Sequence, residues 1–110
     1  MGFIETRVLP LRQPKRGWNG RFFHSEHMTF AYYDIEAGAA LPAHSHENEE
    51  VWHIVQGALN MTLDGRPVRV EAGNAVVIQA GVTHAADADK ECRAIVVDYP
   101  ARHKVAGIEI

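Results

Sequence analysis

Short β-type segments separated by turn residues are the feature that most limits the fold of this chain. Segments rich in Val, Ile, Tyr, Phe and Thr alternate with Gly, Pro, Asn or Asp clusters, and no window of about ten residues reads as an amphipathic helix. The segments are MTFAYYDI, VWHIVQ, ALNMTL, RPVRV, NAVVIQ and RAIVVDY. Asp64-Gly65 is typical of a tight hairpin, because both central residues of a type I′ turn need positive φ. So many short strands in 110 residues predict an all-β sandwich or small barrel.

The length indicates a single domain. A chain of 110 residues can bury a core without disulfides, and 46% hydrophobic and 23% charged residues are ordinary for a globular protein. We expect residues 1–25 to form an N-terminal arm or edge strand and residues 26–110 to form the barrel. Segments such as AVVI are apolar on both faces, which predicts a further layer outside the sheet, such as a second subunit.

Charge and composition exclude several classes of partner. The formal net charge is -3, so nucleic acid is not an expected partner, although residues 1–27 alone carry a net +3. No apolar segment approaches the ~18 residues of a membrane span, and the first residues do not resemble a signal peptide, so we expect no membrane partner and a cytoplasmic protein. The single cysteine, Cys92, lies in an apolar segment and is expected to be a buried hydrophobic residue.

The segment HSHENEEVWH, residues 44–53, concentrates groups that bind metals. In an extended strand, residues i and i+2 point to the same face, so His44 and His46 can present two imidazoles together. If the chain turns and a strand starts at Glu50, its carboxylate lies opposite them, and two nitrogens with one oxygen suit a divalent first-row metal. A solvated acidic loop is the alternative. Glu49 replaces Glu50 if the turn shifts by one residue.

The spacing around this segment resembles the first sequence motif of the cupin superfamily. In GAALPAHSHENEEVWHIVQG, residues 38–57, five residues fall at the motif positions: Gly38, His44, His46, Glu50 and Gly57. The segment GNAVVIQAGVTHAADA, residues 73–88, resembles the second motif through Gly73, Gly81 and His84. It departs from the second motif at Gln79, where the family usually has proline, and at Ala88, where it usually has asparagine. We therefore identify the chain as a small single-domain cupin.

The resemblance implies a double-stranded β-helix, or jelly-roll barrel, with one divalent metal ion. The implied ligands are His44, His46, Glu50 and His84, and the ion is Fe, Mn, Ni, Zn or Co. The other histidines are expected elsewhere. His53 is expected on the opposite strand face, toward the sheet interior or an interface, and the remaining three are expected on the surface: His24, His27 and His103. Glu47 and Glu49 are expected at the rim.

Further residues are candidates for a ligand cavity. Glu50, Trp52 and Gln56 fall on one face of an ideal strand, so Trp52 and Gln56 are expected to line an apolar pocket for a small organic ligand. Three further positions are expected beside them: Met61, Tyr32 or Tyr33, and Gln79. A simple core role is the alternative for the large apolar residues.

The C-terminal segment VVDYPARH is similar to the end of small cupins that act on unsaturated or keto-deoxy uronates. That similarity implies Asp98 as an acid/base and Arg102 as a carboxylate clamp, a role that suits its planar guanidinium. The sequence thus predicts a metal-dependent enzyme acting on a small oxygenated metabolite by dioxygenase, isomerase or lyase chemistry. A non-catalytic ligand sensor and a storage protein are the alternatives. We expect a homodimer, because the outer sheet needs cover.

Overall fold

The computed structural model of the chain describes residues 2–110. Within these residues, twelve strands follow one 3-10 turn at Thr6–Val8. In chain order the strands are β1 Arg12–Lys15, β2 Trp18–His24, β3 Thr29–Ile35, β4 Ala40–His44, β5 Glu49–Gln56, β6 Ala58–Leu63, β7 Arg66–Glu71, β8 Ala75–Ile78, β9 His84–Asp87, β10 Cys92–Tyr99, β11 Lys104–Val105 and β12 Ile108–Glu109. Among residues 2–110, no helix has the length and apolar character needed to cross a bilayer.

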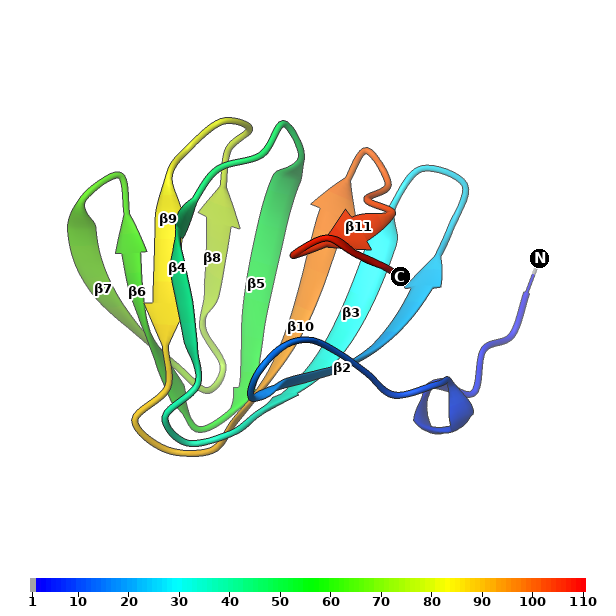
Figure 1. The fold of residues 1–110 in the computed structure, drawn as a ribbon, viewed down its shortest axis with the longest axis horizontal. Coiled ribbons are helices and arrows are strands. Elements are labelled where there is room, and N and C mark those ends of the chain that lie inside the picture. Colours follow the sequence, from blue (N-terminus) through cyan, green and yellow to red (C-terminus); the bar gives the residue numbers. More distant parts are fainter. Residues whose placement is uncertain (1) are drawn as a thin grey trace.

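The strands form two main antiparallel sheets (Figure 1). One sheet has six strands in the order β1-β2-β3-β10-β5-β8, and the other has four in the order β4-β9-β6-β7. Neighbours such as β3 and β10 are far apart in the sequence, as expected for a jelly-roll barrel, and the predicted all-β jelly-roll fold is confirmed. The residues assigned to an N-terminal arm or edge strand include β1 and β2, which lie at one edge of the larger sheet.

The core lies between the two sheets. Residues of β3, β5 and β10 such as Ile35, Ile54 and Ala94 pack against Leu59 and Met61 of β6, and all five are buried. Strand burial alternates, as in β10, where every second residue from Cys92 to Asp98 is buried. The alternation follows from the two-residue period of a strand, which sends successive side chains to opposite faces. The inner faces of the sheets therefore form one hydrophobic core that opens into the site described below.

The predicted hairpin is present between β6 and β7. Asp64 has φ 50° and Gly65 has φ 78°, and Leu63 pairs with Arg66 across the turn. A second hairpin, β11–β12, follows β10, and β11 overlaps β10 and β3 in the view of Figure 1. Val105 and Ala106 line the same cavity as Val96. This C-terminal hairpin places the residues that follow β10 at the mouth of the barrel.

Candidate metal centre

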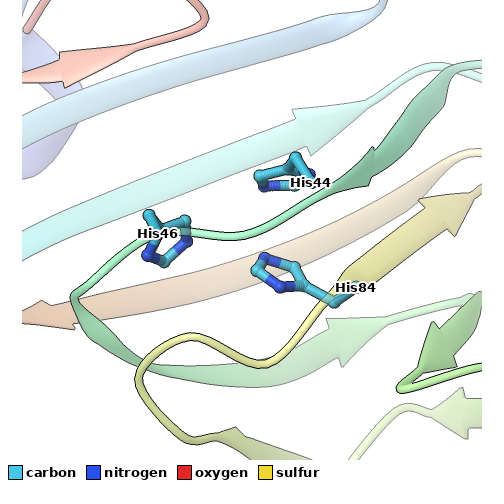
Figure 2. Close-up of side chains that lie close together, drawn as sticks. All are labelled: His44, His46 and His84. Carbon is cyan, nitrogen blue, oxygen red and sulfur yellow. The ribbon is translucent and has the colours of Figure 1, made fainter.

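Three histidines from two parts of the chain lie close together (Figure 2). His44 ends β4, His46 lies in the loop after it, and His84 begins β9. The ring centroids are 4.2 Å apart for His44 and His84, 5.1 Å for His46 and His84, and 5.7 Å for His44 and His46. One nitrogen from each ring lies within 4.8 Å of the other two, which is close enough for a single ion to contact all three.

Local backbone features bring these rings together. Strand β4 contains one extra residue relative to β9 between Leu41 and His44, and this bulge puts His44 directly opposite His84. Pro42 lies in the bulge, where its missing N–H does not break the ladder.

The loop that carries His46 is held at two points. The backbone N–H of Gly81 donates to the His46 carbonyl at 2.8 Å. The side-chain amide of Asn48, which is buried, donates to the Pro100 carbonyl at 2.7 Å. The loop is therefore fixed both to the turn before His84 and to the segment after β10.

The orientations of two rings leave one nitrogen of each free to bind a metal. Nδ1 of His44 lies 2.9 Å from the Pro42 carbonyl oxygen, and Nδ1 of His84 lies 2.9 Å from the Val82 carbonyl oxygen. A carbonyl oxygen only accepts, so each Nδ1 carries the proton and the neutral ring keeps its lone pair on Nε2. Hydrogen bonds of this kind fix the tautomer of metal-binding histidines in general.

Glu50 supplies a buried carboxylate beside the histidines. It lies on β5 and is only 2% exposed. Oε1 accepts a 2.6 Å hydrogen bond from the indole N–H of Trp52 and lies 3.4 Å from Nε2 of His84. Oε2 lies 3.5 Å from Nε2 of His46 and 3.4 Å from the guanidinium of Arg102. The sequence left Glu49 as an alternative, but Glu49 is exposed and its side chain points away from the histidines.

Asp98 faces Glu50 from the neighbouring strand. The two residues are paired in register across β10 and β5, and Asp98 is 4% exposed. Asp98, Glu50 and His46 form a second group whose ligand atoms lie within 4.8 Å of one another. The site therefore combines three imidazoles with two buried carboxyl groups, and His46 belongs to both groups.

The two carboxyl groups differ in their tendency to ionise. Burial raises the pKa of Glu50, but the polar groups of His46, His84, Asp98 and Trp52 that face it outweigh burial and hold the pKa well below its ordinary value. Burial raises the pKa of Asp98, and the facing carboxylate of Glu50 raises it further against the opposing effect of Arg102. Since like charges this close cannot both ionise easily, Glu50 carries the negative charge and Asp98 holds the proton.

The pKa values of His44 and His84 are shifted in opposite directions. Burial lowers the pKa of His44, and the neighbouring His84 and His46 lower it further. Burial acts in the same direction on His84, but the Glu50 carboxylate and the Val82 carbonyl outweigh it and raise the pKa. A lowered pKa keeps the His44 ring neutral, as metal binding requires.

Several buried polar atoms of the cluster lack partners. Within residues 2–110, no hydrogen bond reaches either ring nitrogen of His46, Nε2 of His84 or Oδ1 of Asp98. Leaving such groups buried and unpaired is costly, and a bound cation would satisfy one nitrogen of each ring. Nitrogen and carboxylate donors of this kind suit a divalent first-row ion, so the residues fit the expected metal.

A cavity of about 340 Å³ opens beside Glu50. Of the residues predicted to line it, Trp52 does so, together with His44, Glu50, Asp98 and Arg102. Arg102 is held through its backbone, because its N–H donates to the Thr29 hydroxyl at 2.8 Å. The volume lies near the lower end of the range for small-molecule sites.

The structure places four predicted pocket residues outside this lining. Met61 is buried in the core of the barrel, and Gln79 is exposed in the loop after β8. Gln56 is exposed because β5 has an extra residue opposite the step from Arg93 to Ala94, which interrupts the alternation of faces. Tyr32 is on the outer face of β3, so of the two tyrosines weighed it is Tyr33 that lines the cavity.

Lys15 also lines the cavity, and sequence reasoning missed it. It ends β1, at the sheet edge. The basic character of the N-terminal residues was the available signal, but it does not single out one lysine. Glu47 and Glu49 are exposed, as expected for residues at the rim. His53, expected to face the sheet interior or an interface, is exposed in this chain.

Comparison with known proteins gives one family. A family model described as a cupin domain matches residues 31–98. No curated protein sequence matches the chain.

Solved structures have the same fold at low sequence identity. An RmlC-like cupin from Shewanella frigidimarina has a TM-score of 0.86 at 19% identity, with 93% of each chain covered. KdgF from a Halomonas species has a TM-score of 0.84 at 22% identity, covering 93% of this chain and 96% of that one. An oxalate decarboxylase variant from Bacillus subtilis has a TM-score of 0.76 at 15% identity, covering 91% of this chain and 31% of that one.

Proposed function

This chain belongs to the cupin family, and we propose that it is a metal-dependent enzyme acting on a small oxygenated metabolite. The proposed ligands of one divalent ion are His44, His46, His84 and Glu50. Their donor atoms favour Fe, Mn, Ni, Zn or Co, and the choice among these ions depends on availability as well as affinity. Dioxygenase, isomerase and lyase chemistry are all compatible with such a centre.

The observation that carries the proposal is the convergence of buried nitrogens lacking partners on a cavity. Nε2 of His84 and both ring nitrogens of His46 lack hydrogen bonds within residues 2–110, although they are buried beside an ionised carboxylate. A storage protein has no need for this arrangement. When bound, a divalent ion supplies a Lewis acid that polarises a ligand oxygen or lowers the pKa of water.

The proposed roles of the other polar residues follow from their places in the cavity. Arg102 is proposed to bind a carboxylate of the substrate, because its guanidinium lines the cavity and has N–H groups beyond the one that faces Glu50. Asp98 is proposed to hold or move a proton, because it lines the cavity beside Glu50. The resemblance of VVDYPARH to uronate-acting cupins supports a carboxylate-bearing substrate, of which a sugar acid is one example.

We also propose a homodimer formed through the outer face of the six-stranded sheet. A continuous apolar row crosses five paired strands there, made up of Phe23, Phe30, Val97, Val51 and Val77. Phe23 and Phe30 stack with ring centroids 4.8 Å apart, and Val77 is 62% exposed. An uncharged apolar row can pack against a copy of itself, as a two-fold interface requires.

The experiment compares metal-dependent turnover by the wild type and two glutamate variants. Protein stripped with a chelator and reloaded with each ion is incubated with a panel of small carboxylates, including an unsaturated uronate, and conversion is followed by NMR. We expect conversion that requires metal, is lost in Glu50→Gln and is retained in Glu49→Gln, because only Glu50 faces the histidines. A ligand that raises the melting temperature but is recovered unchanged would favour the sensor alternative, and conversion by metal-free protein would exclude a metal-dependent reaction.

A further inference from the structure

The cavity has a polar end and an aromatic end, and we infer that its ligand is a small carboxylate with an apolar body. The inference rests on the proposed function and adds the chemical class of the ligand. It follows from how the polar groups of the wall are distributed and from which of their hydrogen-bonding atoms are already used.

Most polar groups of the cavity gather around Glu50, whereas Lys15 lies beside Trp18, its partner across β1 and β2. Arg102 lies 3.4 Å from Oε2 of Glu50, and Asp98 lies opposite Glu50 in the next strand. His44 lies at the same end, because its ring centroid is 4.2 Å from that of His84 and Nε2 of His84 is 3.4 Å from Oε1 of Glu50. A carboxylate of the ligand and a second ligand oxygen would both find hydrogen-bonding or metal partners at this end.

Aromatic rings form a continuous wall on the rest of the cavity. Phe22 meets Tyr33 edge to face at 5.6 Å between centroids, Tyr33 meets Trp18 at 5.8 Å, and Trp18 meets Trp52 at 5.9 Å. All four residues line the cavity, with aliphatic side chains beside them. Edge-to-face contacts of this kind hold rings in fixed positions and leave a rigid apolar surface.

Both indole N–H groups of this wall are already used in hydrogen bonds. The indole N–H of Trp18 donates to the Ala40 carbonyl at 3.3 Å, and that of Trp52 donates to Glu50 at 2.6 Å. Among the described lining residues, Tyr33 provides the single hydroxyl group. A ligand with several hydroxyl groups would bury them against carbon and lose its hydrogen bonds to water, which disfavours a sugar body.

The charges of the cavity favour an anion. Arg102 and Lys15 line it, and with a divalent ion bound its charge is positive even when Glu50 and Asp98 are both ionised. The guanidinium has five N–H donors in a planar fork that matches a carboxylate, and its backbone is anchored to Thr29. The best ligand therefore combines a carboxylate at the polar end with a ring or branched chain against the aromatic wall.

The test uses three probes of similar size on zinc-loaded protein. Mandelate has a hydroxy-carboxylate and a phenyl ring, mandelamide has the same shape without the charge, and galacturonate has a carboxylate on a hydroxylated body. Calorimetry should show that mandelate binds about tenfold or more tightly than either of the others, as expected for one charge-assisted contact or several unpaired hydroxyls. Equal affinity for mandelamide would contradict the inference that the ligand carries a carboxylate. Equal or tighter binding of galacturonate would contradict the inference that its body is apolar.

Two variants distinguish binding in the cavity from binding at the protein surface. Arg102→Met should lower the affinity for mandelate to that of mandelamide. Lys104→Met changes an exposed neighbour outside the cavity and should change the affinity for neither probe. Zinc content is measured for every sample. Zinc-loaded protein that binds no probe overturns this inference and leaves the metal site standing, while protein that takes up no zinc overturns the proposed function itself.

Discussion

The guanidinium of Arg102 lies 3.4 Å from Oε2 of Glu50, although 52 positions separate the two residues in the sequence. The contact links the segment after β10 to the histidine cluster, because the Thr29 hydroxyl and the β11–β12 hairpin bring the chain back over the mouth of the barrel. Glu50 thus lies between the proposed metal ligands and the proposed carboxylate clamp. Ligand binding and metal binding are therefore expected to share this one carboxylate.

The indole of Trp52 is predicted to stabilise the Glu50 carboxylate. Trp52→Phe removes the 2.6 Å hydrogen bond and keeps an aromatic ring, and it should lower the free energy of unfolding by about 1–3 kcal/mol because a charged buried group loses a donor. Trp18→Phe is the control, since it removes a longer bond to a neutral carbonyl at 3.3 Å. Urea denaturation of metal-free protein measures both, and an equal or larger loss in Trp18→Phe would argue against the proposed role.

The glycine that closes the first motif is predicted to tolerate substitution less well than the one that opens it. Both have positive φ, +79° at Gly57 and +86° at Gly38, which costs an alanine about 1–2 kcal/mol. A Cβ at Gly57 would also lie 2.7 Å from the Glu91 carbonyl oxygen, whereas one at Gly38 meets nothing within 4 Å. Gly57→Ala should therefore destabilise more than Gly38→Ala by about 1 kcal/mol or more in thermal or urea denaturation. Equal losses would show that the close contact relaxes freely.

Cys92 is predicted to be unreactive in the folded protein. It is 1% exposed, and burial raises the pKa of its thiol above the ordinary value of 9.0. A raised pKa means that the folded state holds the proton more tightly than the unfolded state. The contribution of Cys92 to stability is therefore full below pH 9.0 and is lost as the pH rises through the folded pKa.

The measurement is labelling by a thiol reagent at neutral and alkaline pH, with and without urea. Native protein should label only as fast as it unfolds. Rapid stoichiometric labelling at neutral pH in the absence of urea would show that the thiol is accessible. Labelling in urea provides the control for reagent activity.

The apolar row on the outer sheet face is predicted to hold two chains together. Val51 and Val77 face each other across β5 and β8, so Val51→Lys with Val77→Lys places two like charges in the row. Light scattering should give twice the 12.2 kDa chain mass for the wild type and 12.2 kDa for the variant. Val68→Lys, on β7 of the other sheet, is the control and should leave the dimer intact. A monomeric wild type at micromolar concentration would contradict the proposed dimer.

Much of the fold could be predicted from the sequence because its strands are marked by turns. All six predicted strand segments overlap observed strands, and the turn at Asp64-Gly65 has the predicted backbone conformation. Strands β4, β9, β11 and β12 were not among the six predicted segments, because they are short and lack a run of Val, Ile, Tyr, Phe or Thr. Strands β1 and β2 fall where only an arm or edge strand was expected. Their place is set by pairing with distant parts of the chain, such as β2 with β3.

The site could be predicted less completely. The spacing of histidines and glutamate identified the residues that meet, because i and i+2 geometry and the motif glycines are local properties. The prediction of the pocket depended on assigning each side chain to one face of its strand. These assignments were wrong where the strand is irregular or where both faces carry large residues. The bulge in β5 turns Gln56 outward, and MTFAYYDI has large residues on both faces, so its alternation did not separate Tyr32 from Tyr33. Lys15 reaches the cavity through tertiary packing alone.

Metal binding by the histidine cluster is the central claim, and calorimetric titration of chelator-stripped protein tests it most directly. We predict that the wild type binds one equivalent of zinc or manganese. Affinity should be unchanged in His53→Ala, whose ring is exposed on the opposite strand face. Affinity should fall by about tenfold or more in His46→Ala and in His84→Ala. Failure of the wild type to bind any divalent first-row ion, or undiminished binding in both His46→Ala and His84→Ala, would contradict the account.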